Sequence, residues 1–426
     1  MKRLTFIFLS CALLLTLAGC GGRQVDAPEA ATADAPDAPV EEPDTGYHYL
    51  PKASDEDKPD AGLSEEERAL REAAERAERL AKQEARLRGI VEGMTLEEKV
   101  GQLFFVRCLF TGMEEQIARY HLGGVLLFTQ DYKDSADNWL SRDDFIAKLE
   151  GYQAAAGDIP LFIGSDEEGG TVTRASRNPN LFPSKSRSPQ ELYSSGGLGA
   201  ILNDAAQKSQ LLCGIGVNVN FAPVADVSTD PKDFIYDRAL GRNAADTMAY
   251  VAGVVSVMRD TGVGSVLKHF PGYGNNADTH TGVAIDERPV ETFQKSDCLP
   301  FVGGIRAGAP FVLVSHNVVT SMDAHFPASL SPAVHELLRG ELGFEGVILT
   351  DDLAMDAVKS YARDGGVAVL ALQAGNDMVV TTDFAAQIEQ VLAAVGDGAL
   401  DESLIDAACL RVLRAKQTLG LLELED

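Results

Sequence analysis

The sequence lacks the short motifs that mark most metal and cofactor sites. It has no C-x-x-C pair and no H-E-x-x-H, and its seven histidines are scattered over 426 residues, so no metal site is predicted. No G-x-G-x-x-G follows an apolar run, and neither a P-loop nor a G-x-S-x-G is present, which argues against dinucleotide binding, nucleotide phosphates and a serine-hydrolase elbow. We therefore expect a protein that works without a metal or an organic cofactor.

Positive charge is scarce. Lys and Arg number 37 against 64 Asp and Glu, and the formal net charge is −27. Proteins that bind nucleic acid set Lys and Arg against phosphates, so we expect no nucleic-acid partner. Nothing in the composition indicates an oligomeric state.

The N-terminal apolar segment, Leu4–Leu17, is too short to cross a bilayer comfortably. It follows Lys2 and Arg3 and leads into Leu17-Ala18-Gly19-Cys20, which resembles a bacterial lipobox. We predict that residues 1–20 are a lipoprotein signal peptide and that lipidated Cys20 holds the exported protein to the outer side of a bacterial cell membrane. The alternative is an ordinary signal peptide with an incidental cysteine.

Cysteine is also sparse and widely spaced. Beyond Cys20 the sequence has Cys108, Cys213, Cys298 and Cys409. Export would permit a disulfide, but the apolar neighbours of Cys108 and Cys213 favour buried thiols.

Residues 21–62 contain almost no large aliphatic side chains and are rich in Ala, Pro, Asp and Glu. Such a segment buries too little apolar surface to fold, so we predict a disordered acidic linker. Residues 63–92 are dominated by Glu, Arg, Ala and Leu and predict a charged helical stalk, with a thin apolar stripe marked by Leu70 and Leu80. Thr95 and Glu98 form a capping-box pattern that opens the next helix.

Residues 93–426 predict an α/β domain, a (β/α)8 barrel of the TIM type. Eight short apolar runs predict buried strands, and helical patterns lie between most of them. The runs are Leu103–Leu109, Gly124–Phe128, Leu161–Asp166, Val217–Val224, Ser265–Phe270, Phe311–His316, Val347–Asp352 and Asp377–Thr381. A flavodoxin-like or Rossmann open sheet is the alternative.

Polar residues gather where these runs end, which in a barrel is the face that carries active sites. They are Asp166, Asp226, Lys268, His269, Ser315, His316, Asp351 and Asp352. Strand alternation sends Asp351 and Asp352 to opposite sides, so one readily points into the site and the other caps a helix or bonds a loop. Asp278 and His280 form a D-x-H pair that is suited to general acid/base work.

Other polar residues carry competing interpretations. Lys268 and His269 could donate hydrogen bonds to a polyhydroxylated ligand, and Asp166 could accept them. Glu167 and Glu168 also fit the acidic first turn of a helix. Arg174 and Arg238 also fit isolated surface salt bridges.

Six segments resemble glycoside hydrolase family 3, and in particular its single-domain β-N-acetylhexosaminidase branch. They are SDEEGGTVTR, NVNFAPVADV, KHFPGYG with the following ADTHTG, LVSHN, LGFEGVILTDDLAM and ALQAGNDMV. The resemblance covers about Thr95 to Leu419. The chain departs from the family pattern at Tyr273, Asn275 and Thr279, and in the stretch DFIYDRALG.

The resemblance implies a retaining mechanism, with Asp351 as the nucleophile, His280 as the acid/base and Asp278 orienting His280. It further implies that five residues hold the N-acetylglucosamine unit: Asp166, Arg174, Arg238, Lys268 and His269.

We thus expect a lipid-anchored, extracytoplasmic β-N-acetylglucosaminidase that acts in peptidoglycan turnover on cell-wall fragments, or on chitooligosaccharides. The alternatives are a β-glucosidase, a β-xylosidase or an N-acetylglucosaminide phosphorylase of the same family, and a catalytically silent glycan-binding lipoprotein.

Overall fold

The computed structural model describes residues 64–274, 282–361 and 366–424. The predictions for the signal peptide, for Cys20 and for the linker at 21–62 lie outside the described residues, and so do those for Asp278 and His280.

Eight parallel strands close into a barrel in the order β1-β10-β9-β7-β5-β4-β3-β2. They are β1 (Phe104–Arg107), β2 (Gly124–Leu127), β3 (Phe162–Ser165), β4 (Val219–Asn220), β5 (Gly264–Phe270), β7 (Phe311–Val314), β9 (Val347–Asp352) and β10 (Met378–Thr381). Each predicted run supplies one strand. The open-sheet alternative is wrong, because Phe105 of β1 pairs with Gly124 of β2 on one side and with Val380 of β10 on the other.

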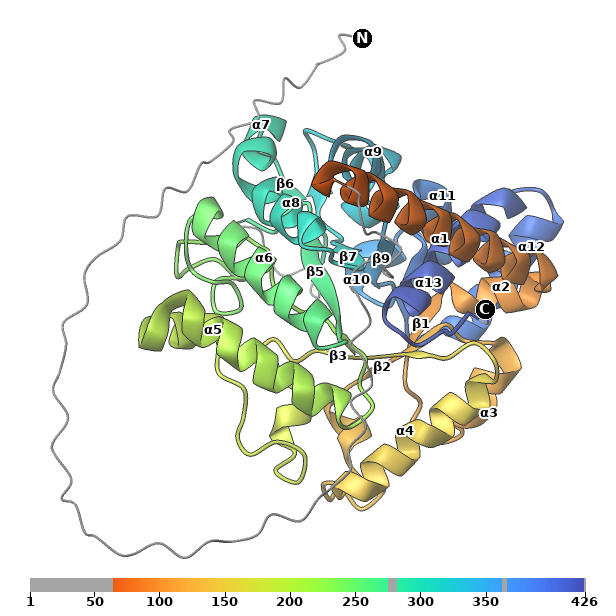
Figure 1. Ribbon diagram of the computed structural model, residues 1–426, viewed down its shortest axis with the longest axis horizontal. Coiled ribbons are helices and arrows are strands. Elements are labelled where there is room, and N and C mark those ends of the chain that lie inside the picture. The colour runs from red at the N-terminus through yellow and green to blue at the C-terminus, as the bar shows by residue number, and fades with distance from the viewer. Residues whose placement is uncertain (1–63, 275–281, 362–365, 425–426) are drawn as a thin grey trace, which may run out of the picture. The chain divides into compact units, whose positions relative to one another are not determined.

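Helices surround the barrel (Figure 1). The longer ones are α1 (Glu65–Gly93), α3 (Met113–Tyr120), α4 (Arg142–Ala156), α5 (Pro189–Cys213), α6 (Ala244–Asp260), α8 (Cys298–Arg306), α11 (Val367–Ala374), α12 (Phe384–Gly396) and α13 (Glu402–Thr418). Shorter elements are α2 (Leu96–Gln102), α7 (Val290–Thr292), α9 (Pro332–Glu336), α10 (Asp356–Lys359) and the small sheet of β6 (Ile285–Asp286) with β8 (Val318–Val319). Side-chain caps start several helices, and Thr95 and Glu98 form the predicted capping box of α2.

Aromatic side chains fill the barrel interior. The Phe105 ring packs against Phe162 with centroids 6.2 Å apart and against the edge of Phe221 at 5.2 Å, and Phe162 meets Phe311 at 5.0 Å. A Cβ on Gly164 would lie 2.7 Å from Phe221, so glycine is needed there for the rings to fit. The interior is therefore a packed core, and a site can form only at its ends.

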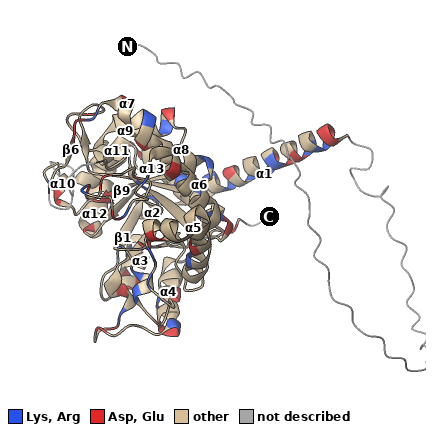
Figure 2. Cartoon of the chain, turned by 90° about the vertical axis from the view of Figure 1, so that its left-hand side faces the viewer, with Lys and Arg blue, Asp and Glu red and all other residues tan. Residues whose placement is uncertain are grey.

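The charged helix is confirmed as α1, in which Lys and Arg alternate with Asp and Glu (Figure 2). Leu70 and Leu80, which marked the expected apolar stripe, are 66% and 54% exposed. Instead Leu87 and Val91 are buried in the core of the barrel domain. The end of α1 thus belongs to the packed domain. No helix among the described residues has the length and apolar character needed to cross a membrane.

The buried-thiol prediction is correct in part. The four cysteines of the described residues are free, and Cys298 and Cys409 are buried, but Cys108 is half-buried and Cys213 is exposed. Cys213 ends α5 on its outer side, where apolar neighbours in sequence point to a different face of the helix.

A lysine is enclosed near the amino-terminal ends of the strands. Lys416 of α13 is fully buried, and its Nζ lies 2.5 Å from Oε1 of Gln102 and 5.1 Å from the centre of the Phe162 ring. No carboxylate among the described residues forms an ion pair with it. Burial lowers the pKa of Lys416 to about 7.

Candidate active site

Three charged residues reach the barrel mouth because the strands alternate. In β3, β5 and β9 the inward positions are followed, two residues on, by Asp166, Lys268 and Asp351. These lie at the carboxyl ends of parallel strands, which converge on one face. The structure thus brings together residues that are up to 185 positions apart in sequence.

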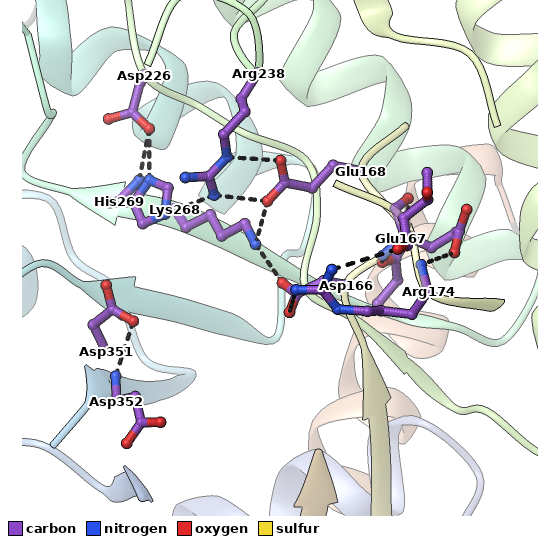
Figure 3. Close-up of polar contacts among 12 residues, drawn as sticks. Asp166, Glu167, Glu168, Arg174, Asp226, Arg238, Lys268, His269, Asp351 and Asp352 are labelled. Atoms are coloured by element: carbon purple, nitrogen blue, oxygen red, sulfur yellow. Dashed lines mark hydrogen bonds and ion pairs between the residues drawn. The ribbon is translucent and has the colours of Figure 1, made fainter. Parts of the chain in front are cut away.

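Lys268 connects two carboxylates at the centre of this face. Its Nζ lies 2.7 Å from Oδ1 of Asp166 and 2.6 Å from Oε1 of Glu168. Arg238 donates to both oxygens of Glu168, at 2.8 and 3.0 Å (Figure 3). The Lys268 and Glu168 side chains are only 4% and 2% exposed, so the centre of the network is nearly free of water, while Asp166 and Arg238 are 14% and 15% exposed at its border.

Glu168 holds this network together as a permanent anion. Burial alone would raise its pKa, but the charges of Arg238 and Lys268 outweigh burial and hold the pKa of Glu168 well below its usual range. The same carboxylate raises the pKa of Arg238 against the opposing effect of burial. Glu168 is therefore unsuited to proton transfer near neutral pH and instead positions the two cations.

The helix-start interpretation of Glu167 and Glu168 is wrong. No helix begins at Glu167 or Glu168, and the chain instead turns through Gly169 and Gly170, at φ 106° and 64°. Both glutamates are buried. Glu167 accepts hydrogen bonds from the backbone N–H and hydroxyl of Ser176 and from the backbone N–H of Arg174, which fixes the loop that carries this arginine.

His269 is held by a buried aspartate. Oδ2 of Asp226 lies 2.8 Å from Nδ1 of His269 and also accepts the His269 backbone N–H, while Oδ1 accepts the Tyr273 backbone N–H at 2.6 Å. If Nδ1 donates to Asp226, Nε2 is left as an acceptor, and it faces Nη2 of Arg238 at 3.2 Å. Both ring nitrogens of His269 therefore have protein partners, and the ring contributes a fixed wall.

Arg174 lies beside the network, and its ion pair with Asp166 is long. Its guanidinium lies 3.8 Å from Asp166 and its carbon lies 5.3 Å from the centre of the Phe128 ring. Its Nε is buried and has no hydrogen-bond partner in the described part of the chain. Arg174 and Arg238 are thus part of the mouth, and the surface-salt-bridge alternative is wrong for both.

The two aspartates at the end of β9 divide their roles as alternation predicts. Asp352 turns to the loop, where Oδ1 accepts the Ala354 backbone N–H at 2.9 Å. Burial raises the pKa of Asp352, and the charge of Asp351 adds to the effect. Asp351 is half-buried, accepts the Asp352 backbone N–H at 2.8 Å, and turns its carboxylate toward the side of Lys268 and His269 (Figure 3).

Comparison with known proteins assigns nearly the whole barrel domain to one family. The profile of the Glycosyl hydrolase family 3 N terminal domain matches residues 95–415. The chain belongs to glycoside hydrolase family 3.

Two curated proteins and one solved structure resemble the chain over most of their length. A beta-hexosaminidase of Nitrosomonas eutropha is 31% identical over 71% of this chain and 85% of its own. Beta-hexosaminidase LpqI of Mycobacterium tuberculosis is 31% identical over 77% of this chain and 84% of its own. A solved family 3 beta-N-acetylglucosaminidase from Paenibacillus sp. superimposes with a TM-score of 0.71 at 28% identity, over 78% of this chain and 64% of its own.

Sequence reasoning did not identify the role of Glu168, nor the contact between Arg107 and Phe128 near the barrel mouth. The pair of glycines after Glu168 was the available signal, because it indicates a tight turn in place of a helix start. Arg107 ends β1 and its guanidinium lies 4.2 Å from the centre of the Phe128 ring. Among the described residues no group of three or more His, Cys, Asp or Glu side chains is arranged to hold a metal.

Proposed function

We propose that the protein is a retaining β-N-acetylhexosaminidase that releases terminal N-acetylglucosamine. The observation that carries the proposal is the placement of Asp351 at the mouth, facing the side on which Lys268, Asp166, Arg238 and His269 form their network. A carboxylate opposite a dense set of fixed hydrogen-bonding groups suits attack on a sugar whose hydroxyls those groups hold. The relatives named beta-hexosaminidase and beta-N-acetylglucosaminidase support the choice of sugar.

In the proposed mechanism the sugar is bound by Asp166 as an acceptor and by Lys268 and Arg174 as donors. Asp351 attacks the anomeric carbon as the bond to the leaving oxygen breaks, which gives a covalent glycosyl-enzyme. His280, oriented by Asp278, supplies the proton that the leaving oxygen takes up. His280 then removes a proton from water as the water displaces Asp351 and releases the sugar.

A phosphorylase is the second candidate within the family. A histidine acid/base adds no negative charge beside the reacting carbon, so an anionic acceptor such as phosphate could approach. The β-glucosidase and β-xylosidase alternatives keep Asp351 but change the sugar. A silent glycan-binding lipoprotein has no need for a nucleophile or an acid/base pair.

We further propose that the enzyme is exported and held to the outer side of a bacterial cell membrane by lipid on Cys20. The sequence Leu17-Ala18-Gly19-Cys20 after a short apolar run supports this placement. Outside the cytoplasm, the fitting substrates are cell-wall fragments in peptidoglycan turnover, or chitooligosaccharides.

The test uses the full chain, purified in detergent, on paired chromogenic β-glycosides. We expect rapid hydrolysis of the N-acetylglucosaminide and little of the glucoside. Asp351→Asn should lower kcat by about a thousandfold or more, while Asp356→Asn, which removes an exposed carboxylate on α10 that pairs with Lys359, should leave kcat unchanged. Full activity in Asp351→Asn would refute the proposal, and turnover that requires phosphate would favour the phosphorylase.

A further inference from the structure

Arg288 connects the parts of the chain on either side of residues 275–281. Its Nε and Nη2 donate to the carboxylate of Asp286, at 3.0 and 2.8 Å, and its Nη1 donates to Oδ1 of Asp297 at 2.8 Å. Nη2 also donates to the backbone carbonyl of Gly272 at 3.2 Å. Gly272 precedes residues 275–281 and Asp286 follows them, while Asp297 directly precedes α8. One guanidinium thus ties both ends of this segment to the start of a helix of the barrel domain.

These contacts are largely buried and directional. The Arg288 side chain is 23% exposed, whereas those of Asp286 and Asp297 are 1% and 2% exposed. The centre of the Phe293 ring lies 4.3 Å from the guanidinium carbon. Hydrogen bonds to ionised groups are about twice as strong as neutral ones, and the planar guanidinium fixes their directions. The position of each partner is therefore narrowly defined.

Two glycines let the backbone run directly past these side chains. Gly274 has φ 58°, and a Cβ there would collide with the guanidinium of Arg288. Gly272 has φ 126°, and a Cβ there would lie 2.6 Å from the Cβ of Asp297. Both positions therefore require glycine, and the chain lies against the guanidinium just before residues 275–281.

The two ends of the segment are also fixed to the rest of the barrel domain. Tyr273, between the two glycines, donates its backbone N–H to Oδ1 of Asp226, whose Oδ2 holds Nδ1 of His269. After the segment, β6 pairs with β8, and the backbone N–H of Thr320 donates to the carbonyl of Asp286 at 2.9 Å. The contacts of Arg288 are thus coupled to the sugar-binding network through Asp226.

We propose that Arg288 is a positioning residue for the acid/base, because it holds the two ends of the segment that contains Asp278 and His280. This inference rests on the proposed function, in which His280 exchanges a proton with the leaving oxygen and then with water. Proton transfer requires the two heavy atoms to come within about 3 Å, and a displacement of about 1 Å can cost about a hundredfold in rate. Loss of the Arg288 contacts should therefore weaken proton transfer and leave attack by Asp351 intact.

The experiment compares two aryl N-acetyl-β-glucosaminides that differ in their need for a proton. Dinitrophenolate leaves without protonation, whereas phenolate is a poor leaving group that depends on an acid. For Arg288→Gln we expect kcat/KM to fall about a hundredfold for the phenyl compound and less than about threefold for the dinitrophenyl compound. A purely structural role would lower both values equally. Arg288→Lys should lose only about tenfold for the phenyl compound, because the charge remains but the planar donors do not.

A second measurement concerns the step in which water displaces Asp351. With the dinitrophenyl compound, Arg288→Gln should accumulate the glycosyl-enzyme, because His280 is then a poor base for water. Azide forms its bond to the anomeric carbon as the bond to Asp351 breaks, and no proton has to be removed from it. Added azide should therefore raise kcat of the variant and leave that of the unmodified chain unchanged.

Two further variants separate positioning from folding. Gly274→Ala keeps all the charges but sets a methyl group against the Arg288 guanidinium, so it should show the same selective loss even if Arg288→Gln, which leaves buried carboxylates unpaired, does not fold. Arg259→Gln is the matched control. Arg259 ends α6 and also donates to a carboxylate and to a backbone carbonyl, those of Asp260 and Ala307, and its replacement should leave both kcat/KM values unchanged.

Circular dichroism shows which variants are folded, and turnover by the unmodified chain reports the proposed function separately. Equal losses on the two compounds in a folded Arg288→Gln or Gly274→Ala variant would overturn the inference. So would a kcat of the variant that azide does not raise.

Discussion

The buried Lys416 gives the sharpest test of the energetics of this fold. Its Nζ has Gln102 and the Phe162 ring as neighbours and no carboxylate partner among the described residues. Its pKa falls from 10.5 to about 7 because burial penalises the charged form. We predict that Lys416→Met stabilises the protein at pH 7 and destabilises it at pH 10.

The sign follows from proton linkage. Between pH 7 and 10.5 the unfolded chain holds a proton on Lys416 that the folded chain has largely released, so the free energy of unfolding rises with pH over this range. Burial of the lysine costs about 4 kcal/mol at pH 7 and about 1 kcal/mol at pH 10. Methionine avoids that cost but leaves Oε1 of Gln102 without a donor, which costs about 2 kcal/mol. The variant should therefore gain about 2 kcal/mol at pH 7 and lose about 1 kcal/mol at pH 10.

The assay is urea unfolding of both proteins at several pH values, because groups common to both cancel in the difference. Lys99 provides the opposite control. Its Nζ lies 2.7 Å from Asp406, and that bond raises the pKa of Lys99 against the effect of burial. Lys99→Met should thus lose stability at pH 7 and lose less as the pH rises above 10.5. A Lys416→Met variant that is equally destabilised at pH 7 and pH 10 would refute the reasoning.

Three further substitutions test other parts of the structure. Glu168→Gln should lower the free energy of unfolding by about 3 kcal/mol and raise KM, because two buried cations lose their shared anion; urea unfolding and steady-state kinetics check this. Gly169→Ala should lower the free energy of unfolding by more than about 2 kcal/mol, since a Cβ would meet the backbone carbonyl of Arg187. Gly197 also has a positive φ, but a Cβ there would meet no other atom, so Gly197→Ala should lower it by only about 1 kcal/mol; thermal unfolding measures both. Arg414→Gln should lower the free energy of unfolding by less than about 1 kcal/mol, because the ion pair of Arg414 with Glu84 is partly exposed. At high salt the variant and the unmodified protein should be equally stable.

The barrel was predictable because its strands are buried on both sides. Continuous apolar runs that end in polar residues identified all eight strands and the face that carries Asp166, Lys268 and Asp351. The boundaries were less certain: the run Val217–Val224 supplies only the two-residue strand β4, Val219–Asn220. Pro223, which lacks a backbone N–H for the ladder, lies within that run.

The site was harder to predict where a residue contacts side chains that are distant in sequence. Glu168 has the sequence context of a helix start, and only the folded chain reveals that Arg238 and Lys268 meet it. Leu87 and Val91 differ little in kind from Leu70 and Leu80, and contact with the barrel decides which of them are buried. The contact between Arg107 and Phe128 had no signal in the sequence, because a single charged residue within an apolar run is ordinary.

The closure of the barrel between β1 and β10 has a consequence for synthesis. The first strand to leave the ribosome pairs with the last one, so one edge of the growing sheet stays open until residues 378–381 have emerged. The C-terminal part of α1 can dock even later in synthesis, because Glu84 pairs with Arg414 of α13. The free edge of β1 therefore stays unpaired from the synthesis of residue 107 until that of residue 381, and a chaperone that binds this edge would protect the growing chain over that interval.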